Sequence, residues 1–206
     1  MLLNRTRSLD WNSDSRFMDD AALVAGLQHG DARAVEYVVQ RYAPALFRYA
    51  YYQLQDAMLA EDLAAEVMTR MIGSIDRFVV GTTPFESWLF RIVRNLIVDE
   101  YRVRKRRPQV SFEQWLTEEP DLEPGAHDSR IAALPDHEEL RAGLATLTDE
   151  QRQVVLLHVV EGWELPQVAQ LLDRSVPSVK SLYYRGVQSL RRALTRGGDT
   201  KGSVRA

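Results

Sequence analysis

Cysteine is absent from this chain of 206 residues. Its absence excludes disulfide bonds, zinc sites built from thiolates and cysteine nucleophiles. Histidine is scarce, and the four histidines share no spacing typical of a metal site (His29, His127, His137 and His158). The chain also lacks a glycine-rich phosphate loop and the G-x-S-x-G and H-E-x-x-H motifs. Nothing in the sequence therefore indicates an enzyme, a bound metal or a cofactor.

Long apolar runs are missing as well. No segment approaches the roughly 18 consecutive apolar residues that a membrane span requires, and residues 1–16 lack the apolar stretch of a secretion signal. We therefore expect a cytoplasmic protein with no membrane contact. The hydrophobic content of 45% is nevertheless sufficient for a packed core, and 206 residues allow two small domains.

Charge is unevenly distributed along a chain whose net charge is only −3. Residues 91–107 and 174–196 are rich in Lys and Arg, whereas residues 113–139 are rich in Asp and Glu and hold a single base, Arg130. Because attraction to phosphate depends on local charge, each basic segment suits DNA, and the acidic remainder weakens DNA binding by the isolated protein. This balance predicts a DNA-binding protein that gains affinity from a partner.

The first half of the chain has the periodicity of amphipathic helices. We expect a helix over residues 20–28, a second that Asp31 caps and Pro44 kinks or restarts, and a third from about residue 59 to 75. Residues 85–107, FESWLFRIVRNLIVDEYRVRKRR, then place apolar side chains on one helical face. That stripe comprises Phe85, Trp88, Leu89, Ile92, Val93, Leu96 and Ile97.

The start of this fourth helix carries a capping pattern. Thr83 stands at the expected cap, Pro84 at the first helical position and Glu86 at the third, which predicts a capping box. The polar face of the helix is then directed to water or to a polar partner. It carries Arg91, Arg94, Asn95, Asp99 and Arg102.

The second half of the chain begins with a composition shift. Residues 108–133 are rich in Pro, Gly and acids, which is typical of a linker with a local turn near Phe112 and Trp115. Helices are then predicted over about 137–146, 149–161, 165–172 and 176–194. Capping boxes are expected at Asp136 with Glu139 and at Thr148 with Gln151, and Gly162 is expected to end the second helix.

The last two of these helices have the spacing of a helix-turn-helix. Val168, Ala169 and Leu172 form one buried face, a short DRS turn follows, and Val179 and Gly186 belong to the facing one. The residues left exposed on the second helix are Ser178, Lys180, Ser181, Tyr184, Arg185 and Gln188. Such polar, cationic and aromatic groups suit a major groove, although two packed helices with a solvated basic face fit the pattern equally well.

These patterns predict an all-α protein made of two small helical domains. The domains cover residues 20–107 and 134–195, and the acidic flexible linker of residues 108–133 joins them. An extension, residues 1–19, precedes the first domain, and a disordered tail, residues 196–206, follows the second.

Read together, the two halves resemble the extracytoplasmic-function sigma factors of the bacterial sigma-70 family. AEDLAAEVMTRM, residues 60–71, resembles the helix of that family that binds the polymerase clamp, and residues 85–107 resemble its promoter-melting and minus-ten-reading helix. Residues 147–172 followed by VPSVKSLYYRG are similar to its minus-thirty-five-reading domain. The chain departs from the family pattern at Pro166-Gln167, Pro177 and Leu182, which leaves the promoter sequence open.

The resemblance implies a sigma factor that directs core RNA polymerase to specific promoters and assists promoter opening. It implies that Asn95 contacts a flipped base, whereas the apolar stripe favours a core role for Trp88. The cations that would contact the minus-ten backbone are Arg91, Arg94 and Arg102, followed by Arg104, Lys105, Arg106 and Arg107. The implied minus-thirty-five contacts are Ser178, Lys180, Ser181, Tyr184 and Arg185. The implied contacts with core polymerase are Glu61, Asp62 and Glu66.

Core RNA polymerase and promoter DNA are the partners that the resemblance implies, and it leaves open an anti-sigma factor as a third. The acidic linker would then follow the RNA path of the polymerase, or serve only as a solubilising tether. Two other classes of protein remain open from the residues alone. One is a freestanding helix-turn-helix regulator, which would footprint its operator without polymerase, and the other is an interaction adaptor, which would not bind DNA.

Overall fold

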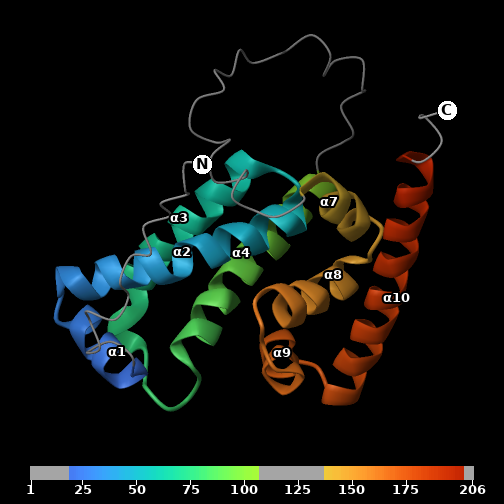
Figure 1. The fold of residues 1–206 in the computed structure, drawn as a ribbon. Coiled ribbons are helices and arrows are strands. Elements are labelled where there is room, and N and C mark those ends of the chain that lie inside the picture. Colours follow the sequence, from blue (N-terminus) through green and yellow to red (C-terminus); the bar gives the residue numbers. More distant parts are fainter. Residues whose placement is uncertain (1–18, 107–136, 202–206) are drawn as a thin grey trace, which may run out of the picture.

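The computed structural model describes residues 19–106 and 137–201, and these residues are helical with no strand among them (Figure 1). The all-α prediction is therefore confirmed for the described chain. The first group of helices comprises α1 (Asp20–Gln28), α2 (Ala32–Leu54), α3 (Ala57–Ser74) and α4 (Phe85–Arg106). The second comprises α7 (His137–Ala145), α8 (Asp149–Val155), α9 (Leu165–Leu172) and α10 (Val176–Lys201).

The core of the first group lies where α2, α3 and α4 pack together. The apolar stripe of α4 supplies Phe85, Leu89 and Val93, which are fully buried, and α3 supplies Val67 and Met71. Both sets recur at intervals of three or four residues, so one face of each helix is withdrawn from water. The predicted apolar faces of α3 and α4 are thus confirmed.

Helix α2 is longer than its sequence suggests. It runs without interruption through Pro44, so the predicted restart at this residue is wrong. Proline removes one backbone donor from a helix interior, which favours a break. Here Ala45, Leu46 and Phe47 directly after it are all buried, and their packing keeps the chain helical.

The N-terminus of α4 is capped from outside its own segment. Its first residue is Phe85, and the Phe85 amide donates a hydrogen bond of 2.8 Å to the Asp20 carboxylate on α1. The predicted cap at Thr83 is wrong, since its hydroxyl is buried without a hydrogen-bond partner among the described residues. Pro84 precedes the helix rather than occupying its first position, because the Pro84 carbonyl accepts the first intrahelical bond, from Trp88.

In the second group, α8 begins with the predicted capping box, in which Thr148 and Gln151 exchange hydrogen bonds. The predicted single helix over 149–161 divides into α8 and a π-helical turn, Leu156–Val160, which Gly162 follows with a positive φ of 76°. Helix α10 continues to Lys201, so the tail predicted to be disordered from residue 196 is instead helical over its first part.

Several predictions fall outside the described residues. The linker 108–133, with its turn near Phe112 and Trp115, belongs to this set. So do residues 1–18 of the N-terminal extension, the cap at Asp136 and the basic residue Arg107.

The two groups of helices lie against each other. In Figure 1, α9 lies beside α4, and α8 approaches the ends of α2 and α4. Contacts join α4 to α9 and α2 to both α8 and the π-helical turn. No pattern in the sequence indicated this contact between the two predicted domains.

Candidate nucleic-acid interface

The polar face of α4 is largely open to solvent. Arg91, Asn95 and Arg102 are exposed, as the helical spacing predicts. Arg94 differs, because it is half-buried and its Nε atom is buried without a hydrogen-bond partner among the described residues. The Asn95 amide offers both a donor and an acceptor, which permits a pair of hydrogen bonds to one base edge.

Two arginines near the end of α4 are paired with acids in the free protein. Arg102 lies 3.1 Å from Asp99, and Arg104 lies 2.9 Å from Glu100 and 3.5 Å from Asp56. Such exposed pairs contribute about 0–1 kcal/mol. Their cations therefore exchange a carboxylate for a phosphate at little cost, which suits a backbone contact.

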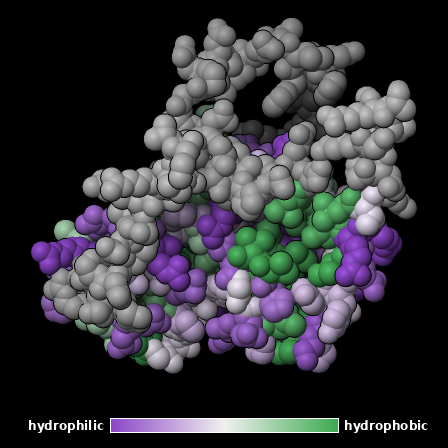
Figure 2. Space-filling model, in the orientation of Figure 1, coloured by the Kyte–Doolittle hydropathy of each residue, from purple (hydrophilic) through white to green (hydrophobic). Residues whose placement is uncertain are grey.

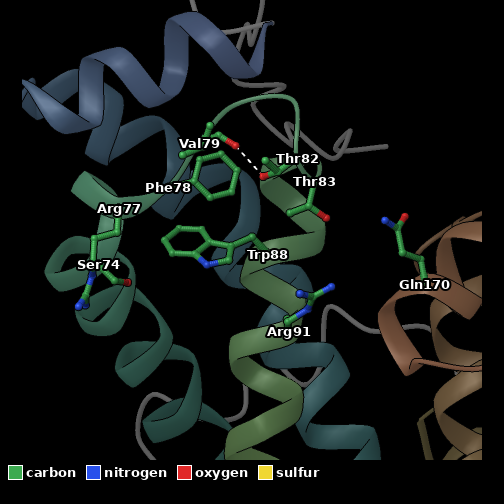
Figure 3. Close-up of a pocket in the computed structure, with 9 residues that line it drawn as sticks. All are labelled: Ser74, Arg77, Phe78, Val79, Thr82, Thr83, Trp88, Arg91 and Gln170. Atoms are coloured by element: carbon green, nitrogen blue, oxygen red, sulfur yellow. Dashed lines mark hydrogen bonds between the residues drawn. The ribbon is translucent and has the colours of Figure 1, made fainter.

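A pocket of about 600 Å³ opens beside the start of α4 (Figure 3). Trp88 forms part of its wall and packs on Phe78 and Phe85, with ring centroids 4.9 and 5.7 Å apart. Trp88 thus packs against the core, in line with the core role predicted for it, but it is only half-buried and also lines the pocket. The remaining lining residues are Ser74, Arg77, Phe78, Val79, Thr82, Thr83, Arg91 and Gln170.

The pocket's loop is held in place by local hydrogen bonds. The Thr82 hydroxyl donates to the Val79 carbonyl at 2.7 Å (Figure 3), and Gly81 adopts a positive φ of 90° that favours glycine. Gln28 of α1 donates to the Ile75 and Phe78 carbonyls at 3.0 and 3.2 Å. A pocket with an aromatic wall, a cation and hydroxyl groups is chemically suited to a planar polar ring such as a nucleobase.

Sequence reasoning missed three residues of this site. Gln28 braces the loop from α1, Thr83 lines the pocket, and Gln170 reaches it from α9. Gln28 and Gln170 carry no periodic or motif signal, because packing between distant segments brings them to the site. Thr83 had a local signal, but the sequence assigned it to a helix cap.

The helix-turn-helix is formed by α9 and α10. Asp173, with φ of 53°, makes the turn, and Val179 and Leu182 bury the inner face of α10. The outer face presents exposed side chains three and four positions apart, and Tyr184 is 64% exposed. The predicted contact residues on this face are Lys180, Ser181, Tyr184 and Arg185, which are exposed, and Ser178, which is half-buried.

The acidic residues of α3 form a separate surface. Asp62 is exposed, whereas Glu61 and Glu66 are half-buried. Glu66 is paired with Arg70 on the same helix at 2.7 Å. Asp62 and Glu66 lie four residues apart, so they share one helical face and can bind one basic partner.

Neither a metal site nor a membrane span is found in the described part of the chain. Residues 19–106 and 137–201 hold no group of three or more His, Asp or Glu side chains placed to bind a metal. No helix among them is long and apolar enough to cross a membrane.

Comparison with known proteins gives matches over both halves of the chain. The family model Sigma-70 region 2 matches residues 38–107, and the model Sigma-70, region 4 matches residues 137–190. The chain is 30% identical over 183 residues to the ECF RNA polymerase sigma factor BldN of Streptomyces coelicolor. The matched region covers 89% of this chain and 68% of BldN. It is also 30% identical over 182 residues to the ECF RNA polymerase sigma factor SigL of Mycobacterium tuberculosis. That match covers 87% of this chain and 99% of SigL.

A solved structure of similar fold is that of the sigma factor RpoE in complex with the anti-sigma factor NepR from Bartonella quintana. The TM-score is 0.62 at 23% identity, and the match covers 78% of this chain and 96% of that one. The fold of the described helices is thus the fold of a known sigma factor.

Proposed function

The chain belongs to the sigma-70 family as an extracytoplasmic-function RNA polymerase sigma factor, and from this premise we propose how its surfaces act in transcription initiation. It directs core polymerase to promoters and assists their opening. Members of this family regulate transcription and are not catalysts, so no reaction is assigned to any side chain. As a partner of the polymerase on the chromosome, it would act in the cytoplasm.

One observation carries the proposal: two exposed basic faces of different geometry stand on two separate domains. The α10 face, with Lys180, Tyr184 and Arg185, suits duplex DNA in the major groove. The α4 face, with Arg91 and Asn95 beside a pocket with an aromatic wall, suits bases that have left the duplex. Promoter recognition requires binding to duplex DNA, and promoter opening requires binding to melted DNA. A chain with a separate domain for each form of DNA is suited to both steps.

The residue roles in this proposal follow from exposure and chemistry. Asn95 captures an unpaired base, while Arg91, Arg94 and Arg102 neutralise phosphates around it. Arg94 becomes fully available only when its buried Nε is uncovered. Ser178, Lys180, Ser181, Tyr184 and Arg185 contact the upstream element.

Core polymerase would bind the acidic side of α3 through Glu61, Asp62 and Glu66. Asp62 is exposed there, and Glu66 would exchange its exposed intrahelical partner, Arg70, for a basic group of the polymerase. An exposed pair of this kind is worth little in the free protein. An anti-sigma factor, like the one bound to the Bartonella protein, completes the set of proposed partners.

Run-off transcription with purified core polymerase on a genomic template library tests the proposal. A sigma factor yields discrete transcripts that depend on both proteins. A freestanding regulator would instead protect an operator from nuclease digestion in the absence of polymerase and would yield no transcript. Absence of transcripts, together with such protection, would overturn the proposal.

A further inference from the structure

Tyr184 is the aromatic side chain on the outer face of α10. It is 64% exposed, and no other Phe, Trp or Tyr among the described residues is an exposed residue. In Figure 1, α7, α8 and α9 all lie on one side of α10, and each of them contacts it. Tyr184 therefore offers an aromatic ring to a partner that binds the outer face.

Two further rings hold Tyr184 in place. Its ring packs on Tyr183 with centroids 5.5 Å apart, and Tyr183 lies nearly perpendicular to the His158 imidazole, with centroids 4.8 Å apart and an angle of 83°. His158 Nδ1 lies 2.6 Å from the Trp163 carbonyl oxygen. Because a carbonyl oxygen can only accept, Nδ1 carries the proton, and this hydrogen bond sets the orientation of the imidazole.

A ring supported in this way has little freedom to lose when it binds a partner. Tyrosine has only two side-chain dihedral angles, and packing on the half-buried Tyr183 restricts them further. A rigid aromatic side chain supplies contact area at a low cost in conformational entropy. The arrangement is that of a preorganised contact.

The next residue, Arg185, indicates which part of the DNA this ring meets. The Arg185 Nε atom donates to the Ser181 carbonyl at 3.2 Å, which holds the guanidinium along the helix. Its two terminal nitrogens can then donate to O6 and N7 of a guanine in the major groove. Tyr184 directly precedes Arg185 on the exposed face, so its ring meets the same base pair or a neighbouring one.

The chemistry of the major groove limits what an aromatic ring can recognise there. The C5 methyl group of thymine is the one methyl group on the edges of the four base pairs, and most other groups are hydrogen-bond donors or acceptors. An apolar ring face that covers a donor or acceptor removes its water without replacing the hydrogen bond. Burial of one methyl group instead increases the affinity about fourfold.

We propose that Tyr184, held by Tyr183, determines specificity at the upstream element by packing on the C5 methyl group of one thymine close to the base pair that Arg185 contacts. The inference rests on the proposed function, because it names a base that the outer face of α10 reads. In this role the aromatic ring makes the contact and the hydroxyl does not.

Deoxyuridine separates the methyl group from every other feature of thymine. It pairs with adenine and keeps the O4 acceptor, and it lacks only the C5 methyl. Duplexes that carry the upstream element of a promoter identified by run-off transcription, with each thymine replaced in turn, are titrated with the full-length chain bound to core polymerase at one fixed salt concentration. We expect one position at which loss of the methyl weakens binding about fourfold.

Variants of the chain assign that effect to Tyr184. Tyr184→Ala should weaken binding to the thymine duplex and abolish the difference between thymine and deoxyuridine at this position. Tyr184→Phe should keep the difference, because the ring remains. Lys180→Ala is the matched control, since it truncates another exposed side chain one turn away on the same face. It should weaken binding to both duplexes equally and leave their ratio unchanged.

Returning a methyl group on a different base gives an independent test. A C·G pair in place of the critical T·A pair should weaken binding, and 5-methylcytosine at the same position supplies the C5 methyl again. The wild type should bind the methylated duplex about fourfold more tightly than the unmethylated one. Tyr184→Ala should bind both equally.

The support from Tyr183 has its own test. Tyr183→Leu removes the supporting ring and keeps an apolar side chain, so it should lower the ratio of thymine to deoxyuridine affinity. Tyr183→Phe keeps the ring and should restore the wild-type ratio. Circular dichroism confirms that both variants are folded. An unchanged ratio in folded Tyr183→Leu would overturn the role of Tyr183.

Three results would overturn the role of Tyr184. They are a deoxyuridine series without effect on the wild type, an effect that persists in Tyr184→Ala, and loss of the effect in Tyr184→Phe, which would assign the contact to the hydroxyl. Any of these results with normal run-off transcription leaves the sigma-factor function intact. Absence of transcripts from the wild type with core polymerase contradicts the function itself.

Discussion

At the scale of single residues, the two DNA-binding surfaces are expected to fail in different ways. Arg185 is exposed on α10 and suits a bidentate contact to guanine, worth about 1–3 kcal/mol of discrimination. Arg185→Ala should therefore weaken closed-complex formation at promoters identified by run-off transcription. Asn95→Ala should leave duplex binding unchanged and impair opening, because its proposed base is accessible only after melting. Permanganate footprinting and gel-shift titration at one fixed salt concentration measure the two steps.

A template with a preformed bubble is the control for this pair. It removes the need to unpair the bases but retains base capture, so the Asn95→Ala defect should persist on it. The assignment of Asn95 is wrong if Asn95→Ala opens promoters and retains bubble templates as well as the wild type does. The assignment of Arg185 is wrong if Arg185→Ala recognises the upstream element unchanged.

At the scale of helices, the sequence predicted the features that are set by residues a few positions apart in the same helix. The apolar faces of α3 and α4 follow from a local period, and the Thr148–Gln151 box follows from spacing. The start of α4 could not be predicted in this way. Its cap comes from Asp20, 65 residues earlier, and only tertiary packing brings that carboxylate to the Phe85 amide.

Helix packing in the second domain depends on a glycine in α10. A Cβ atom built on Gly186 would lie 2.9 Å from Val155 Cγ2 and 3.4 Å from Gln151 Cβ, both on α8. Gly186→Ala should therefore force α8 and α10 apart and destabilise the fold by about 1–3 kcal/mol. Urea unfolding followed by circular dichroism measures the change.

Gly73 of α3 provides the matched control for this substitution. Among the described residues, no atom beyond the neighbouring residues and backbone of α3 itself lies within 4 Å of a Cβ built on it, so Gly73→Ala should be neutral or stabilise the protein by up to about 1 kcal/mol. Equal effects of the two substitutions would contradict the packing explanation and would attribute both to helix propensity alone.

At the scale of the whole molecule, the sequence predicted two domains but not their contact. Phe90 lies off the predicted stripe of α4, and it is buried because Tyr49 and Trp163 cover it. Arg48 and Glu161 are 113 residues apart and carry no shared pattern. A contact made of single residues from distant segments leaves no periodic signal, which is why the contact between the two domains could not be predicted from the sequence.

The contact between the two domains is expected to depend on pH through two partly buried carboxyl groups, Glu161 and Glu86. Burial raises the pKa of Glu161 above its usual range; Arg48 and Arg41 oppose this shift, and Glu86 adds to it. Burial also raises the pKa of Glu86, with Asp20 adding to the shift and Arg41 opposing it. The indole N–H of Trp163 acts on the Glu86 carboxylate without forming a well-made hydrogen bond.

The direction of these shifts sets the sign of the effect. A carboxyl whose pKa is raised while the domains are in contact binds more protons there than after separation, when it returns to water and its pKa is lower. The contact should therefore strengthen as the pH falls from the raised pKa values toward about 4.5, and weaken as the pH rises through the same window. Small-angle X-ray scattering of the free chain, recorded from neutral pH to about pH 4.5, measures this change as a fall in the radius of gyration. Circular dichroism confirms that the chain stays folded. The double substitution Glu161→Gln with Glu86→Gln removes both titrating groups and should flatten the curve. A radius of gyration that rises on acidification while helicity is retained, or an equal response from the double variant, would exclude these carboxyls as the source of the pH dependence.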